Sequence, residues 1–291
     1  EVIVNPDGRV WVERVGRGRE ATDIRVEAAE TERAIRLVAT LTGAEVTRLK
    51  PIVSAELPPR GERFEGVLPP VAKGPCFAIR KPAGQVIRLD QYVEGGIVTN
   101  EQASALKSAI SNRANIIVAG GTGSGKTTLA NALLSEIASL NERVVILEDT
   151  RELQCAAEDV VALRTQPGSV SLAQLVRSTL RLRPDRIIVG EVRGAEALDL
   201  LKAWNTGHPG GLATLHANSA AEGLSRLEDL IGEVTQRIPH RAIGQAIDLV
   251  IHIARTPGGR QPISLNLSPF GPANHSMCVA VVSRPSAVMT F

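Results

Sequence analysis

The sequence is poor in aromatic residues and in cysteine. Its 291 residues include two Trp, one Tyr and four Phe, about 2% in all, so a core must be built from Ala, Val, Leu and Ile. The three cysteines, Cys76, Cys155 and Cys278, form no closely spaced pair, which excludes a disulfide framework and a cysteine-rich zinc site. This use of cysteine is typical of a protein of the reducing cytoplasm.

An excess of charge and a long apolar run are also missing. The 33 basic and 31 acidic residues leave a net charge of +2, so nothing draws the whole chain to nucleic acid or to an anionic membrane. The longest uncharged stretch, between Arg260 and Arg284, contains three prolines and is therefore a poor membrane-spanning helix. No signal peptide is visible, and because the first residue is Glu1 we expect natural N-terminal residues to be missing.

A hydrophobic content of 43% excludes disorder as the main state, and the length favours two modest domains. The first part alternates short apolar segments with turns and contains one amphipathic helix at 27–42, which Gly43 ends. Expected strands lie at 2–4, 10–12, 51–57, 62–68 and 75–80. These patterns predict an N-terminal α+β domain over 1–92, followed by a Gly-Gly linker at 93–98.

From Thr99 onward, expected helices and strands alternate. Thr99 and Gln102 form a capping box that opens a helix, and apolar runs follow at 115–119, 143–148, 186–190, 211–217 and 248–254. Alternation of this kind predicts an α/β domain, here 99–256, with a largely parallel sheet covered by helices. The remaining 257–291 contain five prolines and no acidic residue, so we expect a mostly irregular C-terminal tail.

The strongest motif is a glycine-rich segment that fits G-x-x-x-x-G-K-[ST] and stands between an expected strand and an expected helix. Glycines let backbone N–H groups converge on phosphates, and the helix N-terminus adds a positive dipole end. Lys126 can reach the β- and γ-phosphates, and the Thr127 hydroxyl can hold Mg²⁺. The sequence thus predicts an ATP and Mg²⁺ site whose contacts are Gly121, Thr122, Gly123, Ser124, Gly125, Lys126, Thr127 and Thr128.

Two carboxylates follow expected strands and are candidates for hydrolysis of the nucleotide. Glu148 ends one apolar run and Glu191 another, and the carboxyl ends of parallel strands meet at the edge that holds the phosphate loop. We assign Glu148 to water activation and Glu191, with Thr127, to the Mg²⁺ shell, although the two glutamates could exchange roles. The alternative is that either residue merely caps the following helix.

A segment from Thr206 to Asn218 carries His208 and His216, two of the five histidines. Taken alone, each is more typical of a hydrogen-bonded structural residue than of a catalyst. No carboxylate or cysteine stands at a ligand spacing, which argues against a metal site at these histidines.

Four segments, in this order, resemble the motifs of the secretion ATPase superfamily. GGTGSGKTT is similar to its Walker A motif, ILEDTREL to its Asp box, LRLRPDRIIVGEVRG to its Walker B motif and TGHPGGLATLHANS to its His box. The residues Ala203-Trp204-Asn205 before the His box look most like the conjugal-transfer branch, the TrbB type of type IV secretion ATPase.

This resemblance implies a hexameric ring in which an N-terminal domain is hinged to a RecA-like P-loop domain and nucleotide lies between them. It also implies that Arg63 and Arg80 contact the nucleotide phosphates and act as catalytic cations, and that His208 and His216 sense the γ-phosphate. Because the chain has 27 Arg, a solvated strand position remains the alternative reading for each arginine.

The implied function is hydrolysis of Mg-ATP to energise type IV secretion or conjugal DNA transfer, by pilus assembly or substrate transfer. The protein would be a cytoplasmic homohexamer, associated with the inner membrane only through components of the apparatus. A pilus-retraction ATPase is the nearest alternative, because it too lacks a paired C-x-x-C insertion. Few aromatics and near-neutral charge disfavour a DNA-translocating motor and direct DNA binding without excluding them, since Arg181, Arg183 and Arg186 form a local basic cluster. A nucleotide-gated scaffold without turnover is the third class, and Glu148 and Glu191 argue against it.

Overall fold

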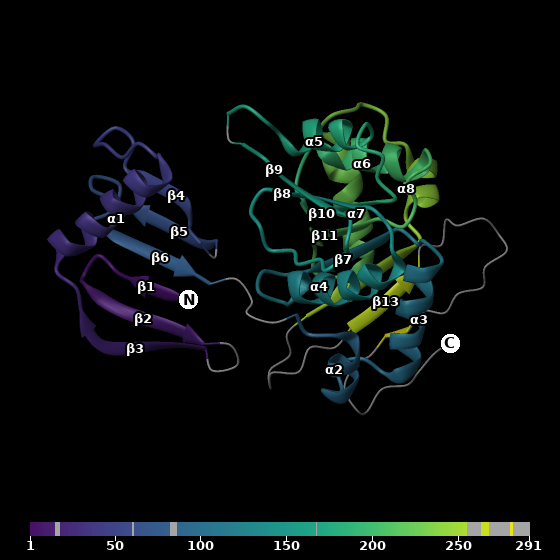
Figure 1. The fold of residues 1–291 in the computed structure, drawn as a ribbon, viewed down its shortest axis with the longest axis horizontal. Helices are drawn as coiled ribbons and strands as arrows, with labels where there is room; N and C mark the ends of the chain where they lie inside the picture. Colours follow the sequence, from purple (N-terminus) through teal and green to yellow (C-terminus); the bar gives the residue numbers. More distant parts are fainter. Residues whose placement is uncertain are drawn as a thin grey trace. The chain divides into compact units, whose positions relative to one another are not determined.

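The chain folds into two compact units, Glu1–Gly84 and Gln85–Phe291, in a computed structural model (Figure 1). The structure describes residues 1–14, 18–59, 61–81, 86–166 and 168–254, together with the backbone of two short strands at 263–267 and 280–281. Each unit has its own sheet.

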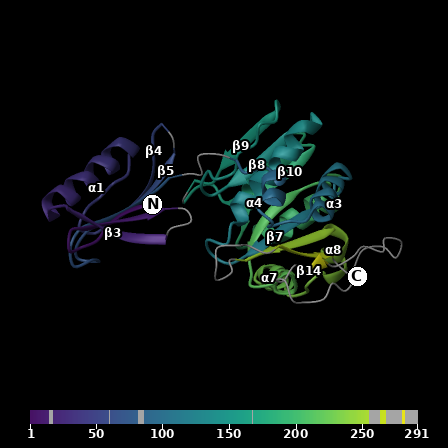
Figure 2. The same ribbon diagram turned by 90° about the horizontal axis from the view of Figure 1, so that it is seen from below.

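The first unit is a six-stranded antiparallel sheet in the order β3-β2-β1-β6-β5-β4, with helix α1 lying along one face (Figure 2). Helix α1 buries Ile35 and Val38 against Phe64 of the sheet, and Gly43 ends it in the left-handed conformation with φ of 69°. The expected helix and its stop are therefore confirmed. The elements are β1 Val2–Val4, β2 Arg9–Arg14, β3 Gly18–Arg25, α1 Ala28–Thr42, β4 Ile52–Leu57, β5 Glu62–Val67 and β6 Cys76–Arg80.

The second unit is built on an eight-stranded sheet in the order β14-β13-β12-β7-β11-β10-β8-β9. The six strands from β12 to β9 are parallel, and β13 and β14 extend the sheet antiparallel, which confirms the predicted largely parallel sheet. The strands are β7 Ile116–Gly120, β8 Val144–Glu148, β9 Val160–Arg164, β10 Arg186–Val192, β11 Leu212–His216, β12 Leu249–Ile253, β13 Ile263–Leu267 and β14 Ala280–Val281. The helices are α2 Leu89–Glu94, α3 Asn100–Ser111, α4 Lys126–Ile137, α5 Leu172–Thr179, α6 Glu196–Asn205, α7 Ala220–Gly232 and α8 His240–Ala246, with a 3₁₀ turn η1 at Ala138–Leu140.

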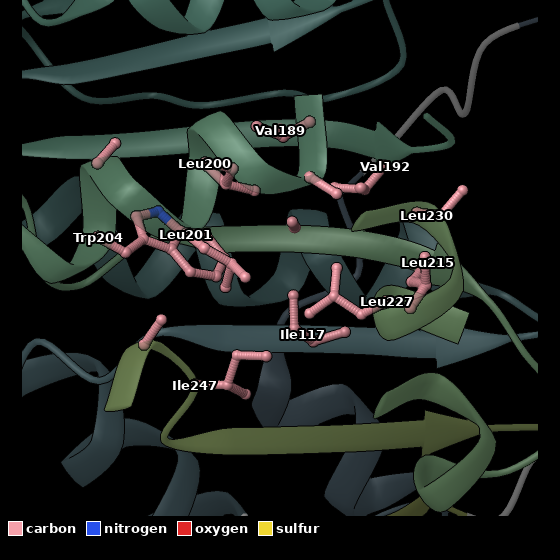
Figure 3. Close-up of a cluster of buried hydrophobic side chains, with 14 of the residues drawn as sticks. Ile117, Val189, Val192, Leu200, Leu201, Trp204, Leu215, Leu227, Leu230 and Ile247 are labelled. Carbon is pink, nitrogen blue, oxygen red and sulfur yellow. The ribbon is translucent and has the colours of Figure 1, made fainter. Parts of the chain in front are cut away.

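Each face of this sheet buries an apolar cluster. Side chains of α5, α6, α7 and α8 form the α6 cluster on one face (Figure 3), and side chains of α2, α3 and α4 form the α4 cluster on the other. Successive strand residues alternate between them: Ile117 points into the α6 cluster, whereas Val118 points into the α4 cluster. The α6 cluster includes Leu172, Val176, Leu200, Leu201, Trp204, Leu227, Leu230 and Ile247.

The boundary between the units falls after Gly84, ahead of the linker expected at 93–98. Tyr92 and Val98 are buried in the α4 cluster, so this segment packs with α3 as part of the second unit. The capping box of Thr99 and Gln102 opens α3 as predicted. Within the tail expected to be irregular, β13 and β14 pair with the sheet, and the rest of 257–291 lies outside the described residues.

Candidate nucleotide site

The phosphate loop connects β7 to α4 and is shaped by its glycines. Gly123 and Gly125 have φ of 67° and 103°, the left-handed region that glycine adopts without strain. A side chain on Gly120 would meet the Ile253 carbonyl and the Ser124 hydroxyl at 2.4 and 2.5 Å. The backbone from Gly120 to Gly125 therefore forms a tight turn, and α4 begins at the next residue, Lys126.

Lys126 is the first residue of α4, and its side chain bends back so that the ammonium contacts the phosphate loop. Nζ donates to the Gly120 and Gly121 carbonyls, each over 2.9 Å. Burial lowers the pKa of this ammonium, and the negative charge of Glu191 opposes that shift. A cation held at a helix N-terminus is a suitable partner for phosphate oxygens.

Thr127 contacts a carboxylate that sequence reasoning missed. Its Oγ1 donates to Glu152 Oε2 over 3.1 Å. Asn131, one turn further along α4, donates to the Glu152 carbonyl and accepts from the Gln154 N–H. Glu152 was not singled out because it lies in a loop, but its place four residues after Glu148 in ILEDTREL was a signal available in the sequence.

Glu148 ends β8 and is almost fully buried, with 4% of its surface exposed. Its Oε1 accepts from the Glu152 and Leu153 N–H groups over 2.9 and 2.8 Å. Burial raises the pKa of this carboxyl to about 6, and the two N–H donors oppose the shift. The side chain thus has the raised proton affinity that a general base near neutral pH requires.

Glu191 lies near the end of β10 and pairs with an arginine two residues later. Its Oε2 accepts from Arg193 Nε over 2.8 Å, and a guanidinium nitrogen of Arg193 stands 4.0 Å from Asp149 Oδ2. The backbone N–H groups of Arg193 and Gly194 both donate to the buried Glu196 carboxylate, which fixes the turn after the strand. Arg193 is a second member of the site that the sequence analysis did not single out.

The two histidines of the His box lie at opposite edges of the sheet. His216 ends β11 and pairs in register with Gly120 of the phosphate loop. His208 precedes β11 at the amino edge, where Nδ1 stands 3.2 Å from the Pro184 carbonyl. The structure therefore brings His216, but not His208, to the predicted nucleotide contacts.

Arg63 and Arg80 belong to the first unit and face each other across neighbouring strands. They are register partners in the antiparallel pair of β5 and β6, so their side chains leave the same face of that sheet. The local basic cluster expected from the sequence is smaller than predicted, because Arg186 is 1% exposed. Its guanidinium bonds Glu142 and the Ile110 and Gly210 carbonyls inside the second unit.

The oxygen-bearing side chains around the phosphate loop suit Mg²⁺. Within the described residues no group of three or more acidic, histidine or cysteine side chains forms a metal cluster. Mg²⁺ is commonly held by one or two carboxylates together with substrate phosphates and water. The Thr127 hydroxyl and the carboxylates of Glu152 and Glu191 offer such oxygen ligands around the phosphate loop.

Comparison with known proteins gives consistent relatives over nearly the whole chain. The family model described as "Type II/IV secretion system protein" matches residues 1–270. The conjugal transfer protein TrbB of Rhizobium radiobacter is 52% identical over 263 residues, which cover 90% of this chain and 81% of that protein. The type IV secretion system protein PtlH of Bordetella pertussis is 34% identical over 289 residues, covering 87% and 83% of the two chains.

Solved structures share the fold. The VirB11 ATPase of the Brucella suis type IV secretion system is 28% identical, with a TM-score of 0.54 over 92% of this chain and 89% of that one. The pilus retraction motor PilT is 21% identical, with a TM-score of 0.65 over 91% and 78%, a likeness of fold alone. The predicted α/β class with a RecA-like P-loop domain is confirmed. None of the helices that the structure describes is both long and apolar enough to cross a membrane.

Proposed function

Because the chain belongs to the type II/IV secretion system protein family, we propose that it hydrolyses Mg-ATP to power a type IV secretion or conjugal DNA-transfer apparatus. The observation that carries the proposal is one sheet edge: the phosphate loop and Lys126 follow β7, and the carboxylates of Glu148 and Glu191 follow two further parallel strands. In this proposal the phosphate loop and both carboxylates belong to the second unit, and the first unit adds Arg63 and Arg80.

The residues divide the chemistry among them. Backbone N–H groups of Gly121–Thr128 and the Lys126 ammonium bind the phosphates. Thr127, Glu152 and Glu191 hold Mg²⁺, which when bound neutralises charge on the phosphate oxygens. Glu148 orients a water molecule and accepts its proton as the oxygen attacks the γ-phosphorus, and the products are ADP and phosphate.

We assign the role of general base to Glu148 because burial raises the pKa of its carboxyl group. The charge of Glu191 acts instead on Lys126 and Arg193, which suits a role in balancing charge at the metal and phosphates. His216, beside Gly120, senses the γ-phosphate.

In the proposed cycle, Arg63 and Arg80 of the first unit contact the phosphates and stabilise the charge that develops on the γ-phosphoryl group. Their register pairing across β5 and β6 places both arginine side chains on one face of that sheet, so both could approach the same nucleotide.

We further propose that the protein acts as a homohexamer on the cytoplasmic side of the inner membrane, docked to components of the apparatus. The relatives named for conjugal transfer and type IV secretion support this setting. Head-to-tail contacts in a closed ring would let each nucleotide site influence its neighbour.

The test is release of phosphate from Mg-ATP over a series of protein concentrations, with the mass followed by light scattering and Lys126→Ala as the control. We expect turnover that rises as the mass reaches that of a hexamer and that disappears in the control. Turnover by a monomer would leave an ATPase but remove the ring. Binding of ATP without turnover, also in the presence of membranes and DNA, would favour a nucleotide-gated scaffold. Stimulation by DNA that salt abolishes would favour the DNA-translocating motor.

A further inference from the structure

Strand β10 contains a bulge at the point where it delivers Glu191. Its pairing with β11 joins Val189 to Ala213 and then Val192 to Leu215, so three steps along β10 match two steps along β11. One extra residue therefore stands in the Gly190–Glu191 segment. Bulges of this kind change the direction of side chains next to active sites.

The bulge changes the face on which Glu191 lies. On a regular strand Glu191 would share the face of Val189, which points into the α6 cluster of apolar side chains. Figure 3 shows Val189 and Val192 together in that cluster, three residues apart, so the alternation has been shifted by one. Glu191 is thereby released from the apolar face, and its charge reaches Lys126 on α4.

The hydroxyl of Thr214 holds this bulge. Thr214 lies on β11 between Ala213 and Leu215, both of which point into the α6 cluster, so Thr214 points to the opposite face, toward α4. It is 2% exposed, and its Oγ1 donates to the Gly190 carbonyl over 2.5 Å. A buried hydroxyl is thus bonded to the carbonyl of the bulge itself.

The same glycine sets the position of the other carboxylate. A side chain on Gly190 would stand 2.9 Å from Glu148 Cγ, so the bulge backbone packs directly on the Glu148 side chain. Gly190 therefore touches Glu148, is bonded to Thr214 and is followed by Glu191. The spacing of the two glutamates depends on where this one peptide lies.

We propose that Thr214 is a positioning residue for hydrolysis: by bonding the Gly190 carbonyl it keeps β10 in the bulged register that directs Glu191 to the nucleotide and packs Gly190 on Glu148. This inference rests on the proposed ATPase function. Thr214 would act through β10, by way of its bond to the Gly190 carbonyl, and would take no direct part in the chemistry. Displacement of a catalytic group by about 1 Å can reduce turnover by about 100-fold while substrate binding persists.

The test uses two substitutions of nearly the same size. Thr214→Val removes the hydroxyl, and Thr214→Ser keeps it. We expect Thr214→Val to lower kcat by at least about ten-fold with the affinity for ATP changed by less than about three-fold, and Thr214→Ser to retain most of the turnover. Equal loss in both variants, or a loss confined to ATP affinity, would overturn the proposal.

A double-mutant cycle shows whether Thr214 acts through Glu191. In the Glu191→Gln background, Thr214→Val should lower kcat much less than it does in the wild-type chain, because the group it positions is already impaired. A general loss of folding would instead add fully to the effect of Glu191→Gln, and full additivity contradicts the proposal.

A crystal structure of Thr214→Val separates this inference from the proposed function. The proposal requires the Gly190 carbonyl or the pairing of Val189 to Val192 to change. If β10 and Glu191 stay where they are, Thr214 does not position them. Absence of turnover in the wild-type protein would remove the ATPase assignment, and this structure would still decide the role of Thr214 in the bulge.

Discussion

His216, the last residue of β11, pairs in register with Gly120, the first residue of the phosphate loop. The next residue, Ala217, donates its N–H to the Gly120 carbonyl over 3.4 Å. His208, in the same sequence motif, lies at the opposite edge against Pro184. Two histidines that look equivalent in the sequence therefore lie at opposite edges of one sheet: His216 at the carboxyl edge, beside the phosphate loop, and His208 at the amino edge.

The first prediction concerns these two histidines. His216→Ala should lower turnover by about ten-fold, equivalent to about 1.4 kcal/mol of transition-state stabilisation, because it stands beside the phosphate loop. His208→Ala should change turnover by less than about two-fold and cost about 1 kcal/mol of stability through its hydrogen bond. Phosphate-release assays and thermal unfolding of both variants provide the measurement. Equal loss of turnover in the two would contradict the separation.

The second prediction concerns Lys126. Lys126→Ala should weaken ATP binding by about 2–5 kcal/mol, because the partner of the phosphate charge is lost. The fold should persist, since Nζ bonds only the Gly120 and Gly121 carbonyls of its own loop among the described residues. Titration with a fluorescent ATP analogue measures affinity, and circular dichroism checks the fold. A folded variant with wild-type affinity would remove the loop from the site.

The third prediction is a pH dependence. The pKa of Glu148 is raised to about 6 by burial, so turnover should fall as the pH drops through about 6 and the carboxyl acquires the proton that a base must lack. The residual activity of Glu148→Gln should lose this inflection. Measurement of kcat between pH 5 and 8 decides the matter, and an unchanged inflection in Glu148→Gln would assign it to another group.

The same group affects stability with the opposite sign. Because the folded-state pKa is above the ordinary value of 4.5, the folded protein binds this proton more tightly than the unfolded chain. The carboxyl therefore favours folding most below about pH 4.5, and this contribution declines as the pH rises through about 6, by about 2 kcal/mol in all. The difference in unfolding free energy between wild type and Glu148→Gln, followed across this range, should show that slope.

The fourth prediction separates the two glutamates. Glu148→Gln should bind ATP and hydrolyse it at least about 100-fold more slowly, since proton transfer contributes about 10²–10⁴-fold. Glu191→Gln should lower kcat by about ten-fold and also raise the Mg²⁺ concentration needed for half-maximal turnover. If Glu191→Gln instead traps bound ATP while Glu148→Gln only shifts the Mg²⁺ dependence, the two roles are reversed.

The fifth prediction concerns Asn115, at the amino edge of the parallel sheet. Asn115 is 4% exposed; its Nδ2 donates to the Ala246 carbonyl, and its Oδ1 accepts from the Gly210 and Gly211 N–H groups. Asn115→Ala leaves these buried backbone groups without a partner and should cost about 3 kcal/mol or more in chemical unfolding. The exposed Asn112→Ala is the control and should stay within about 0.5 kcal/mol. Similar losses in the two variants would contradict this role.

Much of the fold could be predicted because the signals are local. The expected strands at 115–119 and 186–190 correspond to β7 and β10, since a buried parallel strand needs a run of apolar residues. Strand β3 escaped prediction because it is polar, lies at a sheet edge and leaves seven of its eight residues exposed. An edge strand of this kind forms because it pairs with β2, and its own residues show no alternation of apolar and polar side chains.

The site could be predicted only in part, for a similar reason. Lys126, Thr127, Glu148 and Glu191 stand at motif positions or strand ends. The bond between Thr127 and Glu152, and the bulge that Thr214 holds, join segments far apart in the sequence. No local pattern encodes such pairings. Conversely, His208 stands in a motif, but the structure places it at the amino edge of the sheet, away from the phosphate loop.

The ties at the amino edge of the parallel sheet have a mechanical consequence. Asn115 joins the start of β7 to the residues before β11 and β12, and Arg186 fastens β10 to α3 and to the same turn. These strands are therefore tied together at one end, and their other ends lead into the loops of the proposed nucleotide site. We therefore expect a bound nucleotide to displace loops and helices over a rigid sheet, because strands tied together at their amino ends cannot slide past one another.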